Sequence, residues 1–348
     1  MNRNARCGTA TREHGQERGL QPAEILDYPL TCHYQRIVPA CCRLKPALRA
    51  RGALPIVLAF FLTAFALSRF QVALASPAPG LSAARDDNRE KLAWWTDARF
   101  GMFIHWGLYA EDGCFWKGQD GKSEHMMRHL QIPIAEYEKL ATDFNPVKFN
   151  ADDWVRIAKA AGMKYMIITA KHHDGFATYD SKADSYNIVA RTPFKRDPVK
   201  ELAEACRRAG LRFGVYYSLG RDWHDPDVPT RDGYRSNTWD FPDESRKVLS
   251  RYFERKVKPQ VRELLTQYGP IAVMWFDTPE RISKAESEEL VGMIRQLQPQ
   301  CIVNARVGNP LGDYAVQEQK IPESGDPKPW ETCMTLNGHW GYHKMEIM

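Results

Sequence analysis

Apolar strand-length segments alternate with amphipathic helical segments from about residue 90 to the C-terminus, and this repeat constrains the fold more than any other feature. Continuous apolar strands separated by helices are typical of a parallel sheet covered by helices. We expect strands within 99–107, 164–175, 211–219, 270–277, 300–308 and 330–342. We expect helices within 134–144, 151–162, 197–210, 256–269 and 283–299.

Polar and aromatic side chains occur where these strands end. No glycine-rich phosphate loop follows the first strand, as a dinucleotide-binding fold would require. Groups that converge on the carboxyl ends of successive strands form the active site of a barrel. The sequence therefore predicts the α/β class and a (β/α)8 TIM-type barrel. The strand-end groups are His105-Trp106, His172-His173-Asp174, Tyr216-Tyr217-Ser218, Trp275-Phe276-Asp277, and Asn304 with Arg306.

The net charge of +5 is confined to the N-terminal segment. Residues 1–52 hold nine Lys/Arg against four Asp/Glu, so the rest of the chain is balanced. A balanced body has no bulk electrostatic attraction to nucleic acid. The cysteines of the body are widely spaced without a CxxC pair, which predicts free thiols or an occasional disulfide rather than a zinc site. They are Cys114, Cys206, Cys301 and Cys333.

An apolar run at 54–68 follows several basic residues and precedes Ala73-Leu74-Ala75, a small-x-small cleavage pattern. This arrangement predicts a signal peptide over 53–75 and export to the periplasm or the medium. The run is shorter than the roughly 20 residues of a membrane span, but an uncleaved N-terminal anchor is the alternative. Residues 1–52 are interpreted as a leader of unassigned role or a mis-set translation start, and 76–348 as the catalytic barrel.

Asp277 directly follows an apolar strand and two aromatic rings. A solvated loop aspartate is the simpler interpretation. A partly buried carboxylate at the catalytic face of a barrel would instead be a nucleophile or an electrostatic stabiliser.

The other strand ends offer groups suited to sugar hydroxyls. His172 and His173 are adjacent, so on a strand they would point to opposite faces, with one in the pocket. No HxH or HExxH spacing occurs, so we expect no metal site and assign the pocket histidine to a substrate hydroxyl. His105 would add a second ring. Trp106 would add an apolar plate, with packing in the core as the alternative, and Glu124 would add a carboxylate from the following loop, with a surface acid as the simpler interpretation.

A glycosidase needs a second carboxylate to protonate the leaving oxygen. Asp313, Glu318 and Glu323 follow the expected fifth strand, and their spacing alone leaves the choice open.

Five motifs in this order resemble the α-L-fucosidases of glycoside hydrolase family 29: WWTDARFGMFIHWGLYA, YMIITAKHHDGF, LRFGVYYS, AVMWFD and WETCMTLNGHWGY. The resemblance implies a retaining exo-glycosidase with no metal or cofactor, acting on terminal α-L-fucose of glycans. It implies that Asp277 is the nucleophile. Arg306 and the DYAVQEQ segment match the family pattern that places the acid/base on Glu318. The implied fucose contacts are His105, Glu124, His172, His173, Tyr216, Trp275 and Arg306.

Two departures from the family pattern stand out. Thr278 follows the nucleophile position, where relatives often have glycine or another small residue. The chain ends at Met348, where relatives continue through the last barrel strands and usually a β-sandwich. We therefore expect a barrel incomplete at its last strands and no β-sandwich. A catalytically impaired, fucose-binding paralogue and a metal-dependent hydrolase are the alternative functions. The sequence predicts neither linkage preference nor oligomeric state.

Overall fold

A parallel sheet of five strands, in the order β1-β4-β5-β6-β7, forms the centre of the computed structural model. The structure describes residues 79–229, 236–323 and 328–346, which belong to one compact unit, Ala73–Met348. The expected leader (1–52) and signal segment (53–75) lie outside the described residues. Of the helices in the described ranges, none is long and apolar enough to cross a membrane.

The strands follow one another around the sheet in chain order. The central strands are β1 Gly101–Ile104, β4 Tyr165–Lys171, β5 Arg212–Ser218, β6 Val273–Asp277 and β7 Ile302–Val303. A second parallel pair consists of β8 Ala315–Glu318 and β9 Trp330–Cys333. A parallel bridge between Asn304 and Tyr314 links the end of β7 to the start of β8. A short hairpin, β2 Phe115–Trp116 with β3 Gln119–Asp120, lies outside the sheet.

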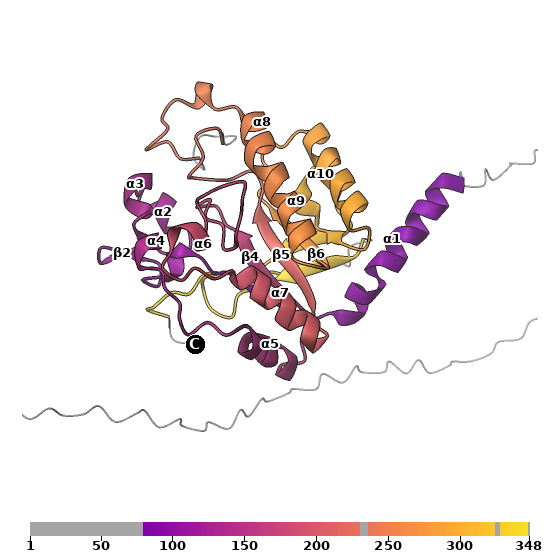
Figure 1. The fold of residues 1–348 in the computed structure, drawn as a ribbon. Helices are drawn as coiled ribbons and strands as arrows, with labels where there is room; N and C mark the ends of the chain where they lie inside the picture. Colours follow the sequence, from indigo (N-terminus) through magenta and orange to yellow (C-terminus); the bar gives the residue numbers. More distant parts are fainter. Residues whose placement is uncertain (1–78, 230–235, 324–327, 347–348) are drawn as a thin grey trace, which may run out of the picture. The chain divides into compact units, whose positions relative to one another are not determined.

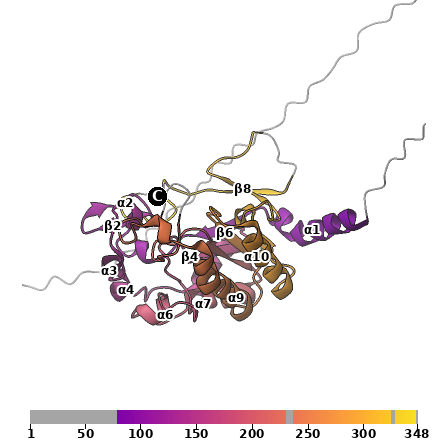
Figure 2. The same cartoon turned by 90° about the horizontal axis from the view of Figure 1, so that it is seen from above.

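The helices occupy the connections between the strands. α7 packs against β5, α5 packs against α7, and α10 packs against α9 (Figure 1). Seen from above, α7, α9 and α10 lie on one side of the strands and β8 lies on the other (Figure 2). The α-helices are α1 Pro79–Ala98, α2 Met126–His129, α3 Ile134–Tyr137, α4 Leu140–Asp143, α5 Ala151–Ala160, α6 Ile188–Arg191, α7 Pro198–Ala209, α8 Leu249–Tyr252, α9 Lys258–Gln267 and α10 Lys284–Leu297. Shorter helical segments are η1 Leu108–Ala110, η2 Glu244–Arg246, η3 Phe253–Val257 and η4 Ala305–Val307.

Local sequence signals explain where the longer helices begin and end. Asp197 caps α7 by accepting a hydrogen bond from the amide of Lys200, and Gly210 ends it in the left-handed region at φ 72°. α10 begins with a capping box, in which Ser283 and Glu286 each accept a hydrogen bond from the other's backbone amide. The predicted boundaries of both helices are therefore confirmed.

A separate apolar cluster fills the interior of the barrel. It contains inward side chains from β4, β5, β6, β7 and β9, together with Leu92 and Trp95 from α1. The Trp95 ring lies 4.4 Å from that of Tyr314, and Trp94 meets Tyr165 edge-on at the start of β4. The last turns of α1 therefore cover the amino ends of the strands, opposite the ends that carry the polar groups.

The barrel prediction is confirmed, with differences in detail. Among the described residues no ladder joins β9 back to β1. The helix expected over 134–144 is two short helices, and the strand expected over 300–308 is only two residues long before the chain turns into η4. Sequence reasoning missed α1, because its residues do not belong to the repeat. The cysteines of the body are buried and free, as one of the two alternatives predicted.

Candidate active site

A cavity of about 440 Å³ opens at the carboxyl ends of the strands. Its lining comes from the ends of β1, β4, β5, β6, β8 and β9 and from the loops that follow them. The lining residues are Phe103, His105, Glu124, His125, Arg128, His172, His173, Tyr216, Arg221, Trp275, Asp277, Thr278, Pro279, Glu280, Arg306, Glu318, Cys333 and Trp340. Of the ten site residues predicted from the sequence, the cavity brings together all except Trp106.

Two hydrogen bonds hold the Asp277 carboxylate at the end of β6, and a histidine lies beside it. Its Oδ1 accepts a hydrogen bond from Arg306 Nη1 at 2.7 Å, and its Oδ2 accepts one from the Tyr216 hydroxyl at 2.8 Å. His173 Nε2 lies 3.7 Å from the same Oδ2. Burial raises the pKa of Tyr216, so its phenol keeps the proton that it donates. The Asp277 side chain is only 14% exposed, which rules out the solvated-loop interpretation.

Strand alternation explains which aromatic residues face the cavity. Tyr216 and Trp275 point inward on neighbouring strands, where their rings stack 5.4 Å apart. Tyr217 points outward and donates a hydrogen bond to Gln260 of α9 at 2.8 Å. Tyr216 therefore faces the cavity and Tyr217 faces away from it, as the period of two along β5 requires.

Arg306 connects the two candidate catalytic carboxylates. Its Nη1 binds Asp277, and its Nη2 binds Glu318 at the end of β8. One guanidinium can bridge two carboxylates because its donors form a rigid planar fork. The Glu318 side chain is 42% exposed, compared with 14% for Asp277, so Glu318 lies nearer the mouth of the cavity.

The other two carboxylates left open by the spacing do not line the cavity. Asp313 is buried and binds Arg295, Lys91 and the backbone amide of Val303. Glu323 is exposed outside the cavity lining.

The prediction that His172 and His173 point to opposite faces is wrong. β4 ends at Lys171, so both histidines lie in the turn beyond it, where strand alternation no longer applies. Their ring centroids are 4.2 Å apart, and both rings line the cavity. His172 stacks on Tyr216, while His173 Nδ1 lies 2.6 Å from Ser218 Oγ.

The placement of Trp106 in the pocket is also wrong. Its ring packs against Phe144, Phe149 and Trp154 on the outer side of β1. His105 and Trp106 are consecutive and point in opposite directions, and His105 takes the inward position. Trp106 is therefore a packing residue between the sheet and its surrounding helices.

Sequence reasoning missed Trp340, which lines the cavity beside His105 with a ring separation of 5.1 Å. A signal was available, because His-Trp-Gly occurs at 105–107 and again at 339–341. Next to Trp340, the amide of Gly341 donates to Glu124 Oε2 at 3.0 Å. Glu124 is therefore buried rather than a surface acid, and burial raises its pKa.

Burial also determines the charge of the histidines. It lowers the pKa of His105 and of His125 to about 3, and it lowers those of His172 and His173. All four imidazoles are consequently neutral at pH 7, when each has one donor and one acceptor nitrogen. The nitrogens of His125, His172 and His173 lie within 4.8 Å of one another, a grouping with ligands for a metal ion.

Another acid, which is half-buried, lies beside Trp275. Glu331 of β9 accepts a hydrogen bond from Trp275 Nε1, and burial raises its pKa to about 7. Its place in an apolar barrel interior is decided by the pairing of β9 with β8, which the sequence does not reveal.

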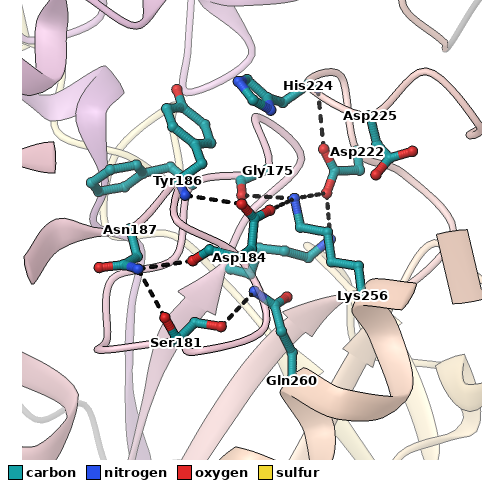
Figure 3. A network of polar contacts seen from close by, with 12 residues as sticks. Gly175, Ser181, Asp184, Tyr186, Asn187, Asp222, His224, Asp225, Lys256 and Gln260 are labelled. Atoms are coloured by element: carbon teal, nitrogen blue, oxygen red, sulfur yellow. Dashed lines mark hydrogen bonds and ion pairs between the residues drawn. The ribbon is translucent and has the colours of Figure 1, made fainter. Parts of the chain in front are cut away.

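A network of buried charges centres on Asp222 and Lys256 (Figure 3). Asp222 Oδ2 binds Lys256 Nζ at 2.8 Å and Lys171 Nζ at 3.2 Å. Lys256 comes from η3, a π-helical segment, and also binds Asp184 Oδ2 at 2.7 Å. Next to Asp222, the amide of Trp223 donates to the carbonyl oxygen of His173 at 2.7 Å. The network therefore ties the turn after β4 to the loop after β5.

The departure at Thr278 has a backbone explanation. Thr278 has a φ of 54°, in the left-handed region that glycine enters without steric cost. Its carbonyl oxygen accepts a hydrogen bond from the amide of Gly220 at 2.8 Å, which helps to hold this conformation.

Comparisons with known proteins agree with this geometry. A family model described as alpha-L-fucosidase matches residues 72–348. Human plasma alpha-L-fucosidase is 32% identical over 282 residues, which cover 74% of this chain and 57% of that protein. The chain thus spans little more than half the length of that relative.

Two solved structures show the same fold. Alpha-L-fucosidase AlfC from Lactobacillus casei, in complex with alpha-L-fucose, superposes with a TM-score of 0.70 at 42% identity. The match covers 74% of this chain and 82% of AlfC. Isoenzyme 1 from Paenibacillus thiaminolyticus gives a TM-score of 0.68 at 39% identity, covering 74% of this chain and 64% of that one.

Proposed function

Because the chain belongs to the alpha-L-fucosidase family, we propose that it is an exo-acting, retaining α-L-fucosidase. Its substrate would be a glycan or glycoconjugate with a terminal α-L-fucose. We also propose export, on the basis of the signal-like segment at 53–75.

The observation that carries the proposal is the bridge from Asp277 through Arg306 to Glu318. Retaining glycosidases hold their two carboxyl groups roughly 5–5.5 Å apart, closer than inverting enzymes do. Two carboxylates bound to one guanidinium support the shorter separation.

Asp277 is the nucleophile in this proposal. Its carboxylate attacks the anomeric carbon, the glycosidic bond breaks, and a covalent fucosyl-enzyme forms with inverted configuration. Arg306 and Tyr216 already hold the carboxylate in a fixed orientation, which lowers the entropic cost of the attack.

Glu318 is the general acid and then the general base. It donates a proton to the leaving oxygen in the first step and removes one from water in the second, so the configuration at the anomeric carbon is restored. Its position nearer the mouth suits a group that meets the leaving group.

The neutral histidines can bind the hydroxyl groups of fucose, and the tryptophan rings can contact its methyl group. Imidazoles of His105, His172 and His173 can donate to or accept from hydroxyl groups. The rings of Trp275 and Trp340 offer apolar surface for the 6-methyl edge.

The direct test is hydrolysis of 4-nitrophenyl α-L-fucopyranoside, with NMR identification of the first anomer of fucose released. We expect α-L-fucose first, and Asp277→Gly should lose at least about a thousandfold in kcat. Added azide should restore turnover of this variant by forming β-L-fucosyl azide.

Asp313→Asn is the matched control, because Asp313 is a buried, ion-paired carboxylate outside the cavity. It should lower stability but leave kcat/KM close to that of the wild type. Release of β-L-fucose first, or normal turnover by Asp277→Gly, would refute the retaining assignment. Saturable fucose binding without turnover would instead support the impaired paralogue.

A further inference from the structure

Three imidazoles from two separate segments face one another in the cavity. His125 precedes α2, whereas His172 and His173 follow β4. The His125 ring centroid lies 5.9 Å from that of His172 and 5.1 Å from that of His173. One ligand nitrogen from each residue lies within 4.8 Å of the other two.

The hydrogen bonding of the rings leaves nitrogens free to bind. His172 Nδ1 is buried without a hydrogen-bond partner, which is a costly state that a ligand would relieve. His173 Nδ1 is occupied by Ser218, which fixes the ring and leaves Nε2 on the cavity side. This bond to Ser218 resembles the outer partner that orients a metal-binding histidine.

Two carboxylates lie beside the rings, and the positive charges of Arg128, Arg221 and Lys171 also act on them. Glu124 Oε1 lies 3.6 Å from His125 Nε2, and Asp277 Oδ2 lies 3.7 Å from His173 Nε2. A dication between the rings would therefore have two carboxylates immediately beyond its nitrogen ligands. Three neutral imidazoles would contribute no opposing charge.

We propose that His125, His172 and His173 form a binding site for a zinc-class divalent cation, and that this ion inhibits the enzyme. Nitrogen ligands select Cu²⁺, Zn²⁺ and Ni²⁺ over Mg²⁺ and Ca²⁺, which prefer oxygen. Zn–N bonds are about 2.0–2.1 Å, so small side-chain rotations would draw the three nitrogens together around the ion.

Inhibition follows from the position of the ion, and this part rests on the proposed function. An ion held by His172 and His173 removes two of the proposed fucose contacts. It would also lie beside Asp277 and attract the carboxylate that must attack the anomeric carbon. The ion is consequently a competitor of the sugar rather than a cofactor.

Binding can be measured without substrate. Calorimetric titration of the full chain with ZnCl₂ should show one site, and CuCl₂ should quench tryptophan fluorescence. Trp223 is the expected reporter, because its ring lies 5.5 Å from those of both His125 and His173. MgCl₂ and CaCl₂ should give no signal at the same concentrations.

His125→Asn should weaken Zn²⁺ binding at least tenfold, and His172→Asn should do the same if the first variant folds poorly. His343→Asn is the matched control, because His343 stacks on His339 away from the cavity. It should leave Zn²⁺ affinity unchanged. Equal affinity in the wild type and His125→Asn, or loss of affinity only in His343→Asn, would overturn the site.

Competition separates this proposal from the proposed function. L-Fucose should raise the apparent Kd for Zn²⁺, and Zn²⁺ should raise KM for the nitrophenyl fucoside without changing kcat. Zn²⁺ binding that depends on His125 in a protein without fucosidase activity would support the site and refute the function. Activation by Zn²⁺, or inhibition that lowers kcat alone, would overturn the competitive role.

Discussion

Removal of Lys256 tests whether the buried charge network stabilises the fold. Lys256 is 2% exposed, and its Nζ binds Asp222 and Asp184 and lies 3.3 Å from the carbonyl oxygen of Gly175. In Lys256→Met the aliphatic stem keeps its volume, so the change removes mainly the charge. We expect the free energy of unfolding to fall without a large cavity effect.

The magnitude follows from what the substitution leaves behind. Breaking a buried ion pair costs about 3–5 kcal/mol, because the remaining charge is uncompensated. Asp222 keeps Lys171, and the Asp184 side chain is 22% exposed and can gain water. Both facts place the expected loss at the lower end, about 3 kcal/mol.

The network also predicts how the loss depends on pH. Burial alone would raise the pKa of Asp222, but the charges of Lys256 and Lys171 outweigh burial and hold it below its usual range. A carboxyl whose pKa is lowered by folding stabilises the protein at pH values above its pKa in the unfolded state. This stabilisation disappears as pH falls through its pKa in the folded state. The difference between the wild type and Lys256→Met should therefore shrink below about pH 4.

Urea denaturation at pH 7 and at pH 3.5 measures both effects. Lys258→Met is the matched control, because Lys258 forms ion pairs with Glu254 and Glu289 at the surface. Exposed pairs contribute about 0–1 kcal/mol, so this variant should remain near the wild type. A loss below about 1 kcal/mol in Lys256→Met, or equal losses in the two variants, would refute the reasoning.

Three further predictions concern two residues of the cavity lining and the acid beside Trp275. Arg306→Lys should lower kcat/KM at least tenfold with little loss of stability, because one ammonium cannot bridge Asp277 and Glu318; unchanged kinetics would contradict the bridge. Glu331→Gln should flatten the pH dependence of stability. Burial raises the pKa of Glu331 to about 7, so protonated Glu331 contributes fully to the free energy of unfolding below about pH 4.5. This contribution, about 3 kcal/mol, is lost as pH rises through 7. Thermal melts at pH 5 and pH 8 measure this, and parallel profiles for the two proteins would contradict it. Trp340→Ala should raise KM for the nitrophenyl fucoside more than it lowers kcat, whereas an unchanged KM would exclude a sugar contact.

Sequence periodicity determined the features of the fold that depend on residues close together in the sequence. The repeat of apolar strands and amphipathic helices was enough to predict the parallel barrel and its catalytic end. Alternation along β5 and β6 placed Tyr216, Trp275 and Asp277 on the inner face. Side chains two positions apart on a strand share a face whatever the rest of the chain does.

The tertiary structure decided the features that depend on distant segments. His172 and His173 share the cavity because β4 ends one residue before them, and the loop after β5 holds that turn. The pairing of Asp222 with Lys171 and Lys256 joins three separate segments.

Contacts between distant segments also account for the features of the cavity that the sequence did not predict. The position of Asp277 at a strand end was evident from the sequence. Its contact with Arg306, and the contact of Arg306 with Glu318, depend on how β6, the turn after β7, and β8 lie next to one another. Local pattern specifies which face a side chain takes, whereas the partner across the barrel is set only when the strands assemble.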